Sequence, residues 1–260
     1  MMSVTEEVFL QLVRLGIGTY TKASLPENVN WEEVIALAER QRLSAIILDG
    51  IESFPEKQRP PQIVLLNLIG EILQNYEGRY AQYKGAISSL AGFYNQHGFK
   101  MMELKGYACS LDWPKPEHRP CGDIDIWLLG HYKEADAALR AWFKSSKVQG
   151  FEIDNSHHHH TTFSWRDFLV ENHYDFINVH HHKSNVELDR FLKELALDDS
   201  YYVEVNGEKI HIPSPNFHAF FLMRHIMNHF SSSEITMRQL LDWVFFCRET
   251  WKGGGLATDT

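Results

Sequence analysis

In the run Arg119-Pro120-Cys121-Gly122-Asp123-Ile124-Asp125-Ile126-Trp127-Leu128, two aspartates stand two residues apart in a segment that otherwise has the composition of a buried strand. Side chains alternate between the two faces of a strand, so Asp123 and Asp125 are expected to point the same way. Aligned carboxylates between apolar residues are unfavourable unless a cation lies opposite them. Mg²⁺ favours oxygen ligands, often one or two carboxylates together with substrate phosphates. The pattern indicates a magnesium site, although a strand end whose acids face water explains the spacing of the aspartates equally well.

A second apolar segment lies just upstream and ends in Lys105 and Gly106. It begins at Phe99, and the residues from Tyr107 to Trp113 suit one or two helical turns. The predicted order is therefore strand, turn, helix, bulge and strand. A turn at Gly106 that leads into a helix offers backbone N–H groups to phosphate, and Lys105 adds a positive charge. We expect phosphates at this turn and the metal at the aspartates.

The order of short motifs in this part of the chain is specific. It runs Leu104-Lys105-Gly106, Trp113-Pro114-Lys115-Pro116, Arg119-Pro120 and Gly122-Asp123-Ile124-Asp125. This order resembles a little-characterised nucleotidyltransferase-like family of the DNA polymerase β superfamily. In that family a Leu-Lys-Gly element stands where better-known relatives have a Gly-Ser pair, and an Arg-x-x-Gly-Asp-x-Asp block follows. The resemblance implies an α+β fold, with a small mixed β-sheet nucleotidyltransferase core flanked by N-terminal and C-terminal helical regions.

The expected organisation has three parts along the chain. Residues 1–97 form an N-terminal helical region, 98–183 the nucleotidyltransferase-like core, and 184–260 a C-terminal hairpin and helical region. The spacing of apolar residues predicts helices over 5–16, 31–40, 43–51, 63–96, 133–143, 185–195, 217–230 and 234–251, with Gly78 and Gly85 as weak points. An Asn-Gly turn predicts a hairpin over 202–212. Arg238 and Asp242 have the spacing of a structural ion pair on a helix.

The superfamily pattern implies a third carboxylate on a later strand. Residues that favour strands surround Arg166-Asp167, which predicts a hairpin with its turn at these two residues. In that register Glu171, His173 and Asp175 share a face with Thr162, His160 and His158. The run Val170-Glu171-Asn172-His173 also resembles the Val-Glu-x-His element of the family. We expect Glu171 to be the third metal ligand or the general base, with Asp175 as the alternative.

The resemblance implies a transferase that moves a nucleoside monophosphate from a nucleoside triphosphate to a hydroxyl of a small-molecule or protein acceptor. Mg²⁺ or Mn²⁺ would be held by Asp123, Asp125 and Glu171. Lys105 and Arg119 would neutralise phosphate charge, and His173 would contact phosphate or support Glu171. Gly106 and Gly122 would let the backbone approach the ligand. Two other interpretations remain open, which are a non-catalytic nucleotide-binding or partner-binding module with this fold, and a metallohydrolase.

The metallohydrolase would use two blocks of histidines, 157–160 and 180–182, together with Asp175. Neighbouring side chains on a strand point to opposite faces, so only alternate histidines could share an ion. Cys109, Cys121 and Cys247 are isolated from one another and supply no zinc-binding spacing. The alternative interpretation is that the histidines face solvent. His173 and His160 are the best candidates for an exception, with a role beside Glu171. A nucleophilic role for Cys121 has no neighbouring base to support it.

Composition limits the classes of partner. The chain has 260 residues, of which 44% are hydrophobic and 23% charged, as in ordinary globular proteins. Its net charge of −9 argues against broad electrostatic capture of nucleic acid. The first residues lack the pattern of a signal peptide, and no apolar run has the length of a membrane span. We expect a cytoplasmic protein, in agreement with the three isolated cysteines.

Overall fold

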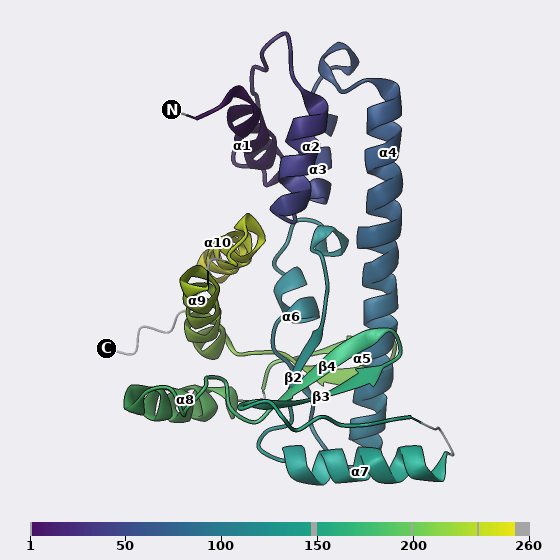
Figure 1. The fold of residues 1–260 in the computed structure, drawn as a ribbon, viewed down its shortest axis with the longest axis vertical. Coiled ribbons are helices and arrows are strands. Elements are labelled where there is room, and N and C mark those ends of the chain that lie inside the picture. Colours follow the sequence, from purple (N-terminus) through teal and green to yellow (C-terminus); the bar gives the residue numbers. More distant parts are fainter. Residues whose placement is uncertain (1, 147–149, 199, 233, 253–260) are drawn as a thin grey trace.

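The computed structural model describes residues 2–146, 150–198, 200–232 and 234–252 (Figure 1). The helices are α1 (Val4–Gly16), α2 (Trp31–Arg40), α3 (Ser44–Glu52), α4 (Gln62–Ile72), α5 (Arg79–Gln96), α6 (Gly106–Ser110), α7 (Tyr132–Ser145), α8 (Lys183–Ala196), α9 (Pro215–Ser231) and α10 (Met237–Lys252). Short helical segments are η1 (Glu56–Gln58), the π-helical η2 (Leu73–Gly78) and η3 (Pro116–His118). The strands are β1 (Met102–Glu103), β2 (Ile124–Trp127), β3 (His160–Trp165), β4 (Phe168–His173), β5 (Tyr202–Val205) and β6 (Glu208–His211).

The helices α1 to α4 form one end of the molecule and have a hydrophobic core of their own. Ser3 and Glu6 form a capping box at the start of α1, and Asn30 accepts a hydrogen bond from the Glu33 N–H at the start of α2. The apolar faces behind these caps meet in a core around Leu12 and Ile46. Side chains of the last helix, α10, and Trp113 join the same core. The N-terminal helices are thus packed onto the rest of the chain.

Together α4, η2 and α5 form a nearly continuous helical rod that runs from one end of the molecule to the other (Figure 1). The π-helical segment ends at Gly78, one of the two glycines expected to weaken this helix. Beyond it, α5 buries Tyr83 and Ile87 in a second core that includes Ile124 and Val170 of the sheet. The rod therefore belongs to the N-terminal helices over its first half and to the sheet over its second half.

The sheet is mixed and has the strand order β3-β4-β2-β1-β6-β5. Strand β2 runs parallel to β4 and antiparallel to β1, and β1 runs parallel to β6. The hairpin β3-β4 turns at Arg166-Asp167, and the hairpin β5-β6 turns at Asn206-Gly207, where both residues have positive φ (51° and 83°). Both hairpins were expected from their turn residues. The structure confirms the α+β fold with a mixed sheet flanked by helices.

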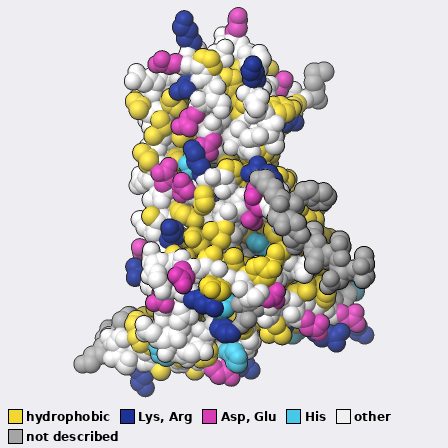
Figure 2. Space-filling model, turned by 180° about the vertical axis from the view of Figure 1, so that it is seen from behind, with side chains coloured by type: hydrophobic (Ala, Val, Ile, Leu, Met, Phe, Trp, Pro, Cys, Tyr) yellow, Lys and Arg dark blue, Asp and Glu magenta, His cyan; other side chains and the backbone are white. Residues whose placement is uncertain are grey.

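The C-terminal helices α9 and α10 pack beside the sheet, and a cavity lies between them and the sheet. Helix α9 packs Phe217 into a core that contains Trp127, and α10 crosses to the N-terminal helices through Phe245. None of the helices in the described ranges is long and apolar enough to cross a membrane. Figure 2 shows the reverse face, where basic and acidic side chains are interspersed along the length of the molecule.

Candidate active site

The acidic side chains predicted as metal ligands converge at one end of β2. Asp125 lies in the middle of β2, is 1% exposed, and stands opposite Glu171 of the parallel strand β4. Asp123 directly precedes β2 and is exposed. Both aspartates line a cavity of about 320 Å³ between the sheet and the helices α9 and α10. The parallel register therefore brings together three carboxylates that lie up to 48 positions apart, as the separation of Glu171 from Asp123 shows.

Lys105 occupies the centre of this acidic group. Its Nζ lies 2.7 Å from Oδ1 of Asp125. Burial would lower the pKa of Lys105, but the charges of Asp125 and Asp123 outweigh it and raise that pKa. Burial would likewise raise the pKa of Asp125, but the Lys105 ammonium and a hydrogen bond from His173 hold it well below its ordinary value. The pair is fully charged at neutral pH.

His173 connects the two buried carboxylates. Its Nε2 lies 3.1 Å from Oδ1 of Asp125 and 3.4 Å from Oε2 of Glu171. Burial would lower the pKa of His173, but the hydrogen bonds to Asp125 and Glu171 raise it. One ligand atom from each of the three residues lies within 4.8 Å of the others. Asp123 faces the same cavity, and partial burial followed by repulsion from Asp125 raises its pKa.

This donor set fits a hard divalent cation. Carboxylates are ligands of Mg²⁺ and Mn²⁺ sites and suit these ions better than they suit softer metals, whereas the imidazole of His173 would lie beside the ion. Burial is the largest cause of the raised pKa of Asp123, and repulsion from Asp125 and Glu171 adds to it in spite of Lys105. A divalent cation would relieve this repulsion. Asp125, Glu171 and Asp123 are the residues that would hold it, with His173 beside them.

The turn at Gly106 differs from the expectation that its backbone N–H groups are free for phosphate. The N–H groups of Tyr107 and Ala108 donate to the side chain of Glu103, at 2.9 and 2.6 Å. The hydroxyl of Tyr83 donates to the same carboxylate at 2.8 Å. The expectation is wrong for these two N–H groups, because a carboxylate from the preceding strand already caps the helix.

Gly106 is needed for packing inside the protein. A Cβ at this position would lie 2.0 Å from the Tyr83 hydroxyl oxygen and 2.3 Å from a carboxylate oxygen of Glu103. Burial raises the pKa of Glu103 to about 7, against the three hydrogen bonds that lower it. Glu103 was not recognised from the sequence, although a single acid inside the apolar run 99–104 is a signal of a buried, satisfied carboxylate.

Arg119 is also placed differently from the expectation that it neutralises phosphate. Its side chain is 3% exposed and forms two hydrogen bonds with Asp242, at 2.8 and 3.0 Å. A third bond, of 2.9 Å, runs from Nη1 to the carbonyl oxygen of Gly106. Arg238 and the Trp113 indole N–H also bind Asp242, which confirms the predicted ion pair on α10. The Arg119 guanidinium is thus occupied in anchoring the Gly106 turn to α10.

The alternative third ligand, Asp175, is directed elsewhere. Strand β4 ends at His173, and the Asp175 carboxylate pairs with Lys193 of α8. The prediction that Asp175 shares a strand face with Glu171 is therefore wrong, whereas the predicted register of Glu171 against Thr162 and of His173 against His160 is confirmed. Burial raises the pKa of Cys121 to about 12, so this thiol is not a nucleophile at neutral pH.

The remaining walls of the cavity come from distant parts of the chain. Gly122 and Arg42 lie at its rim, and side chains of α9, α10 and the segment between them close the other side. The residues from that region are His225, His229, Glu234, Thr236, Arg238 and Gln239. Nothing in the local sequence distinguishes these residues from others on the same helices, so they were not ranked in advance.

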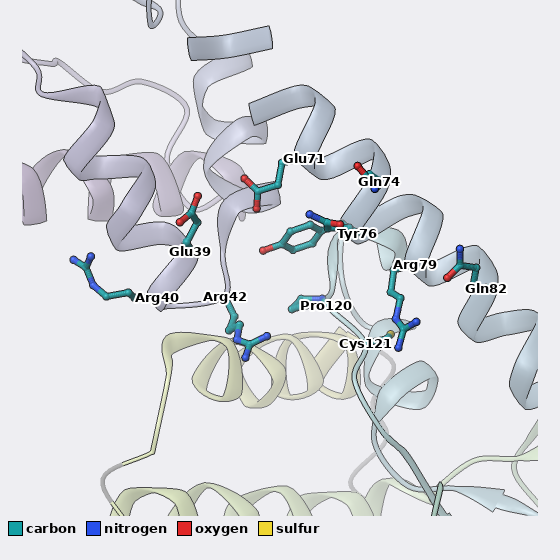
Figure 3. A pocket seen from close by; sticks show the side chains of 11 residues that line it. Glu39, Arg40, Arg42, Glu71, Gln74, Tyr76, Arg79, Gln82, Pro120 and Cys121 are labelled. Carbon is teal, nitrogen blue, oxygen red and sulfur yellow. The ribbon is translucent and has the colours of Figure 1, made fainter. Parts of the chain in front are cut away.

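A larger hollow of about 850 Å³ adjoins this cavity and shares Arg42, Pro120 and Cys121 with it. Figure 3 shows Tyr76 between Glu71 and Pro120, with Glu39 of α2 facing the same space. Burial and then the charge of Glu39 raise the pKa of Glu71. The hollow is therefore polar, with acidic groups on the side of α2 and α4.

Comparisons with known proteins found one similar solved structure and one matching family. A crystal structure of an antigenic nucleotidyltransferase-like protein from Paracoccidioides brasiliensis is similar over 63% of this chain and 74% of its own, with 19% identity and a TM-score of 0.41. No match is found among curated proteins. The model of a family described as uncharacterised nucleotidyltransferase matches residues 27–254. Since this match runs from before α2 to the end of α10 and includes all three carboxylates, the chain belongs to the uncharacterised nucleotidyltransferase family.

Proposed function

We propose that this protein is a nucleotidyltransferase that transfers a nucleoside monophosphate from a Mg²⁺-bound nucleoside triphosphate to a hydroxyl group. The observation that carries the proposal is the parallel register of Asp125 with Glu171, with Asp123 at the same cavity. This arrangement supplies oxygen donors on two adjacent inner strands of the sheet, next to a cavity lined by Lys105. Mg²⁺ at such a site would neutralise phosphate charge and lower the pKa of the attacking hydroxyl.

Lys105 would bind phosphate in this proposal. Its ammonium lies in the cavity wall and pairs with Asp125, whose charge a divalent cation would also neutralise. The flexible stem of a lysine lets its ammonium move to a nearby phosphate oxygen. Lys105 would then stabilise the charge that develops on the transferred group.

Glu171 would accept the proton of the acceptor hydroxyl, and His173 would position Glu171. Burial would raise the pKa of Glu171, but the hydrogen bond from His173 lowers it, so this carboxylate is ionised at neutral pH. An ionised carboxylate opposite Asp125, which lines the cavity, can accept the proton of the attacking hydroxyl, or bind the metal. His173 would hold Glu171 and Asp125 in their relative positions through its bonds to both.

The acceptor would enter through the larger hollow. This space shares the wall residues Arg42, Pro120 and Cys121 with the carboxylate cavity, and its volume of about 850 Å³ suits a small molecule or a protein side chain. Its polar lining suits a hydrophilic acceptor with hydroxyl groups. The net charge of −9 speaks against a polynucleotide acceptor.

The test measures binding and turnover separately. Isothermal titration with Mg·ATP and Mg·GTP gives affinity, and pyrophosphate release with a panel of hydroxyl acceptors gives turnover. Asp125→Asn should lower turnover by about a thousandfold, while Asp167→Asn, an exposed acid in the β3-β4 turn, should leave it unchanged. Turnover retained in Asp125→Asn would remove the metal role of this residue.

A second function has one observation in its favour. The Lys105–Asp125 pair places a cation where a metal would bind, as expected of a nucleotide-binding module that works without chemistry. In that case the titration shows nucleotide binding that does not depend on Mg²⁺, and no acceptor gives pyrophosphate. Metal-dependent binding together with pyrophosphate release favours the transferase.

A further inference from the structure

A group of histidines beside the carboxylate cavity has buried ring nitrogens that form no hydrogen bond with any described residue. These atoms are Nδ1 of His159, both ring nitrogens of His160, and Nδ1 of His173. His160 and His173 are 5% and 6% exposed, and His159 is half-buried. The nearest charged group is a carboxylate oxygen of Glu171, 3.8 Å from Nδ1 of His160, which is beyond hydrogen-bond distance. Each buried polar atom without a hydrogen bond costs about 1–3 kcal/mol, and folded proteins seldom leave several together. The cluster therefore requires a physical explanation.

The three rings face one another at short range. The ring centroids of His159 and His160 are 4.3 Å apart, and those of His160 and His173 are 5.2 Å apart. One nitrogen from each ring lies within 4.8 Å of the other two. The backbone holds this arrangement, since His160 stands opposite His173 in the β3-β4 ladder. The carbonyl oxygen of His159 accepts hydrogen bonds from two consecutive N–H groups that follow β4, at 3.0 and 3.1 Å.

The second nitrogen of His173 has the partner that metal-binding histidines typically have. Its Nε2 lies 3.1 Å from the carboxylate of Asp125. A histidine that binds a metal through one nitrogen usually donates its other N–H to a carboxylate, which fixes the ring and its tautomer. With Nε2 engaged in this way, Nδ1 of His173 is left as the ligand atom. This hydrogen bond is an observation independent of the unpaired nitrogens.

We propose that His159, His160 and His173 form a binding site for a divalent transition-metal ion such as Zn²⁺, adjacent to the carboxylate site. Three imidazole nitrogens suit Zn²⁺ and its neighbours in the first transition series, whereas the carboxylates suit Mg²⁺ and Mn²⁺. Zn–N bonds of about 2.0–2.1 Å in tetrahedral geometry separate the nitrogens by roughly 3.3 Å. The ring nitrogens already lie within 4.8 Å of one another, and small side-chain rotations, above all of His159 in the bend before β3, would bring them to this separation.

The site is distinct from the exposed histidines of the same blocks. His157, His158, His180, His181 and His182 are exposed and would bind added metals weakly at the surface. The proposal does not rest on the transferase activity, because His159 and His160 lie outside the group of Asp125, Glu171 and His173, and only His173 is shared between the two sites. It also differs from the metallohydrolase interpretation, because Asp175 is paired with Lys193.

The experiment uses Co²⁺ alone as the probe, on the full chain after treatment with a chelator. The background variant carries His157→Ala, His158→Ala, His180→Ala, His181→Ala and His182→Asn, in which the asparagine keeps a cap for α8. The expected result is one Co²⁺ per chain in calorimetry, with the intense visible absorption of a four- or five-coordinate ion. Adding His159→Ala or His160→Ala should weaken the affinity by at least about a hundredfold, because loss of a supporting partner alone weakens metal binding 10–100-fold.

His159→Ala is the decisive change, since His159 belongs to this cluster and not to the group of Asp125, Glu171 and His173. If His160→Ala fails to fold, His159→Ala still carries the test. The proposal is overturned if the background variant gives no intense Co²⁺ absorption, or if His159→Ala leaves the Co²⁺ affinity unchanged. Titration of Mg·ATP in the same variants separates the two proposals, because loss of His159 should not alter nucleotide binding at the carboxylates.

Discussion

Two ion pairs flank the turn at Gly106, and their surroundings differ. On one side Arg119 is enclosed by Asp242 and the Gly106 carbonyl, and Asp242 has two further partners, Arg238 and Trp113. On the other side Lys105 meets Asp125 at the wall of the cavity, where Asp123 and Glu171 add negative charge. All three guanidinium nitrogens of Arg119 and both carboxylate oxygens of Asp242 form hydrogen bonds inside the protein. The Lys105 group has more negative charge than one ammonium balances.

This difference assigns a structural role to the Arg119–Asp242 pair and a role in ligand binding to the Lys105–Asp125 pair. Burial would raise the pKa of Asp242, but Arg119 and Arg238 lower it, so the charges of that network are satisfied internally. At the cavity, burial and then repulsion from Asp125 raise the pKa of Asp123, although the charge of Lys105 lowers it. A surplus of negative charge beside a cavity is a feature of sites that bind cationic or metal-bound ligands. Substitutions on the two sides should therefore affect different properties.

The largest effect is expected from Arg119→Met, which should lower the free energy of unfolding by about 3–5 kcal/mol because it leaves a buried anion short of a partner. Urea unfolding followed by tryptophan fluorescence measures it. Arg190→Met is the matched control, since Arg190 is 77% exposed and lies 3.9 Å from Glu194. The control should change stability by less than about 0.5 kcal/mol. Equal stability of the two variants would contradict the structural role of Arg119.

Lys105→Met should change activity more than stability, which is the opposite of Arg119→Met. We expect a decrease of about a hundred- to a thousandfold in kcat/KM for nucleotide transfer, from the loss of a positive charge that stabilises the transition state. The unfolding free energy should change less than in Arg119→Met, because His173 still binds Asp125. Lys115→Met, at a lysine that pairs with Asp49 away from the cavity, should leave kcat/KM unchanged. A stable Lys105→Met variant with full activity would contradict the comparison.

Local patterns predicted much of the fold and part of the site. Helices followed from apolar spacing, and both hairpins followed from their turn residues, because these signals depend on neighbours in the sequence. The position of Glu171 could be predicted once the turn at Arg166-Asp167 was placed, since a hairpin of fixed turn has a fixed register.

The errors at the site have a common cause in contacts between distant residues. Arg119 and Asp242 lie 123 positions apart, so no local pattern showed that the arginine is occupied. Glu103 fills the helix start at Gly106 only because Tyr83, on another helix, encloses it from the other side. Asp175 was assigned to a strand face because the end of β4 has no sequence signal, whereas Lys193 of α8 determines where its side chain points.

A smaller effect is expected at Glu103, on the structural side of the turn. Both carboxylate oxygens of Glu103 accept hydrogen bonds, and Glu103→Gln replaces one of them with an amide NH₂ that cannot accept. This unmatched buried group should lower stability by about 1–3 kcal/mol at pH 5. Because burial raises the folded-state pKa of Glu103 to about 7, the folded protein binds more protons than the unfolded chain between the two pKa values. Wild-type stability should therefore fall as the pH rises through this window.

The measurement is the urea midpoint from pH 5 to pH 8 for the wild type, Glu103→Gln and the exposed control Glu204→Gln. The deficit of Glu103→Gln should shrink as the pH rises, because the wild type alone loses stability from this group. The control should follow the wild type. A deficit that stays constant over this range would show that Glu103 has an ordinary pKa in the folded protein.

The smallest effect concerns the junction between the N-terminal helices and the loop before β2. His118 is buried there, with Nδ1 2.8 Å from Asp49 of α3 and Nε2 3.4 Å from Glu77 of η2. Burial would lower the pKa of His118, but the bond to Asp49 and its charge raise it. A raised folded-state pKa stabilises the protein fully below the ordinary value of the unfolded chain, and the stabilisation is lost as the pH rises through the folded-state value.

His118→Gln should thus remove part of the decrease in stability with rising pH. The comparison is best made in the Glu103→Gln background, where the overlapping contribution of Glu103 is absent. The urea midpoint should then fall between pH 6 and pH 8 with His118 present, and fall less with His118→Gln, while His181→Gln at an exposed position behaves as the parent does. Parallel profiles for all three proteins would mean that the two carboxylates at this junction do not hold a charged histidine. In that case hydrophobic packing around Trp113 and Phe245 would be the main link between the N-terminal helices and the site.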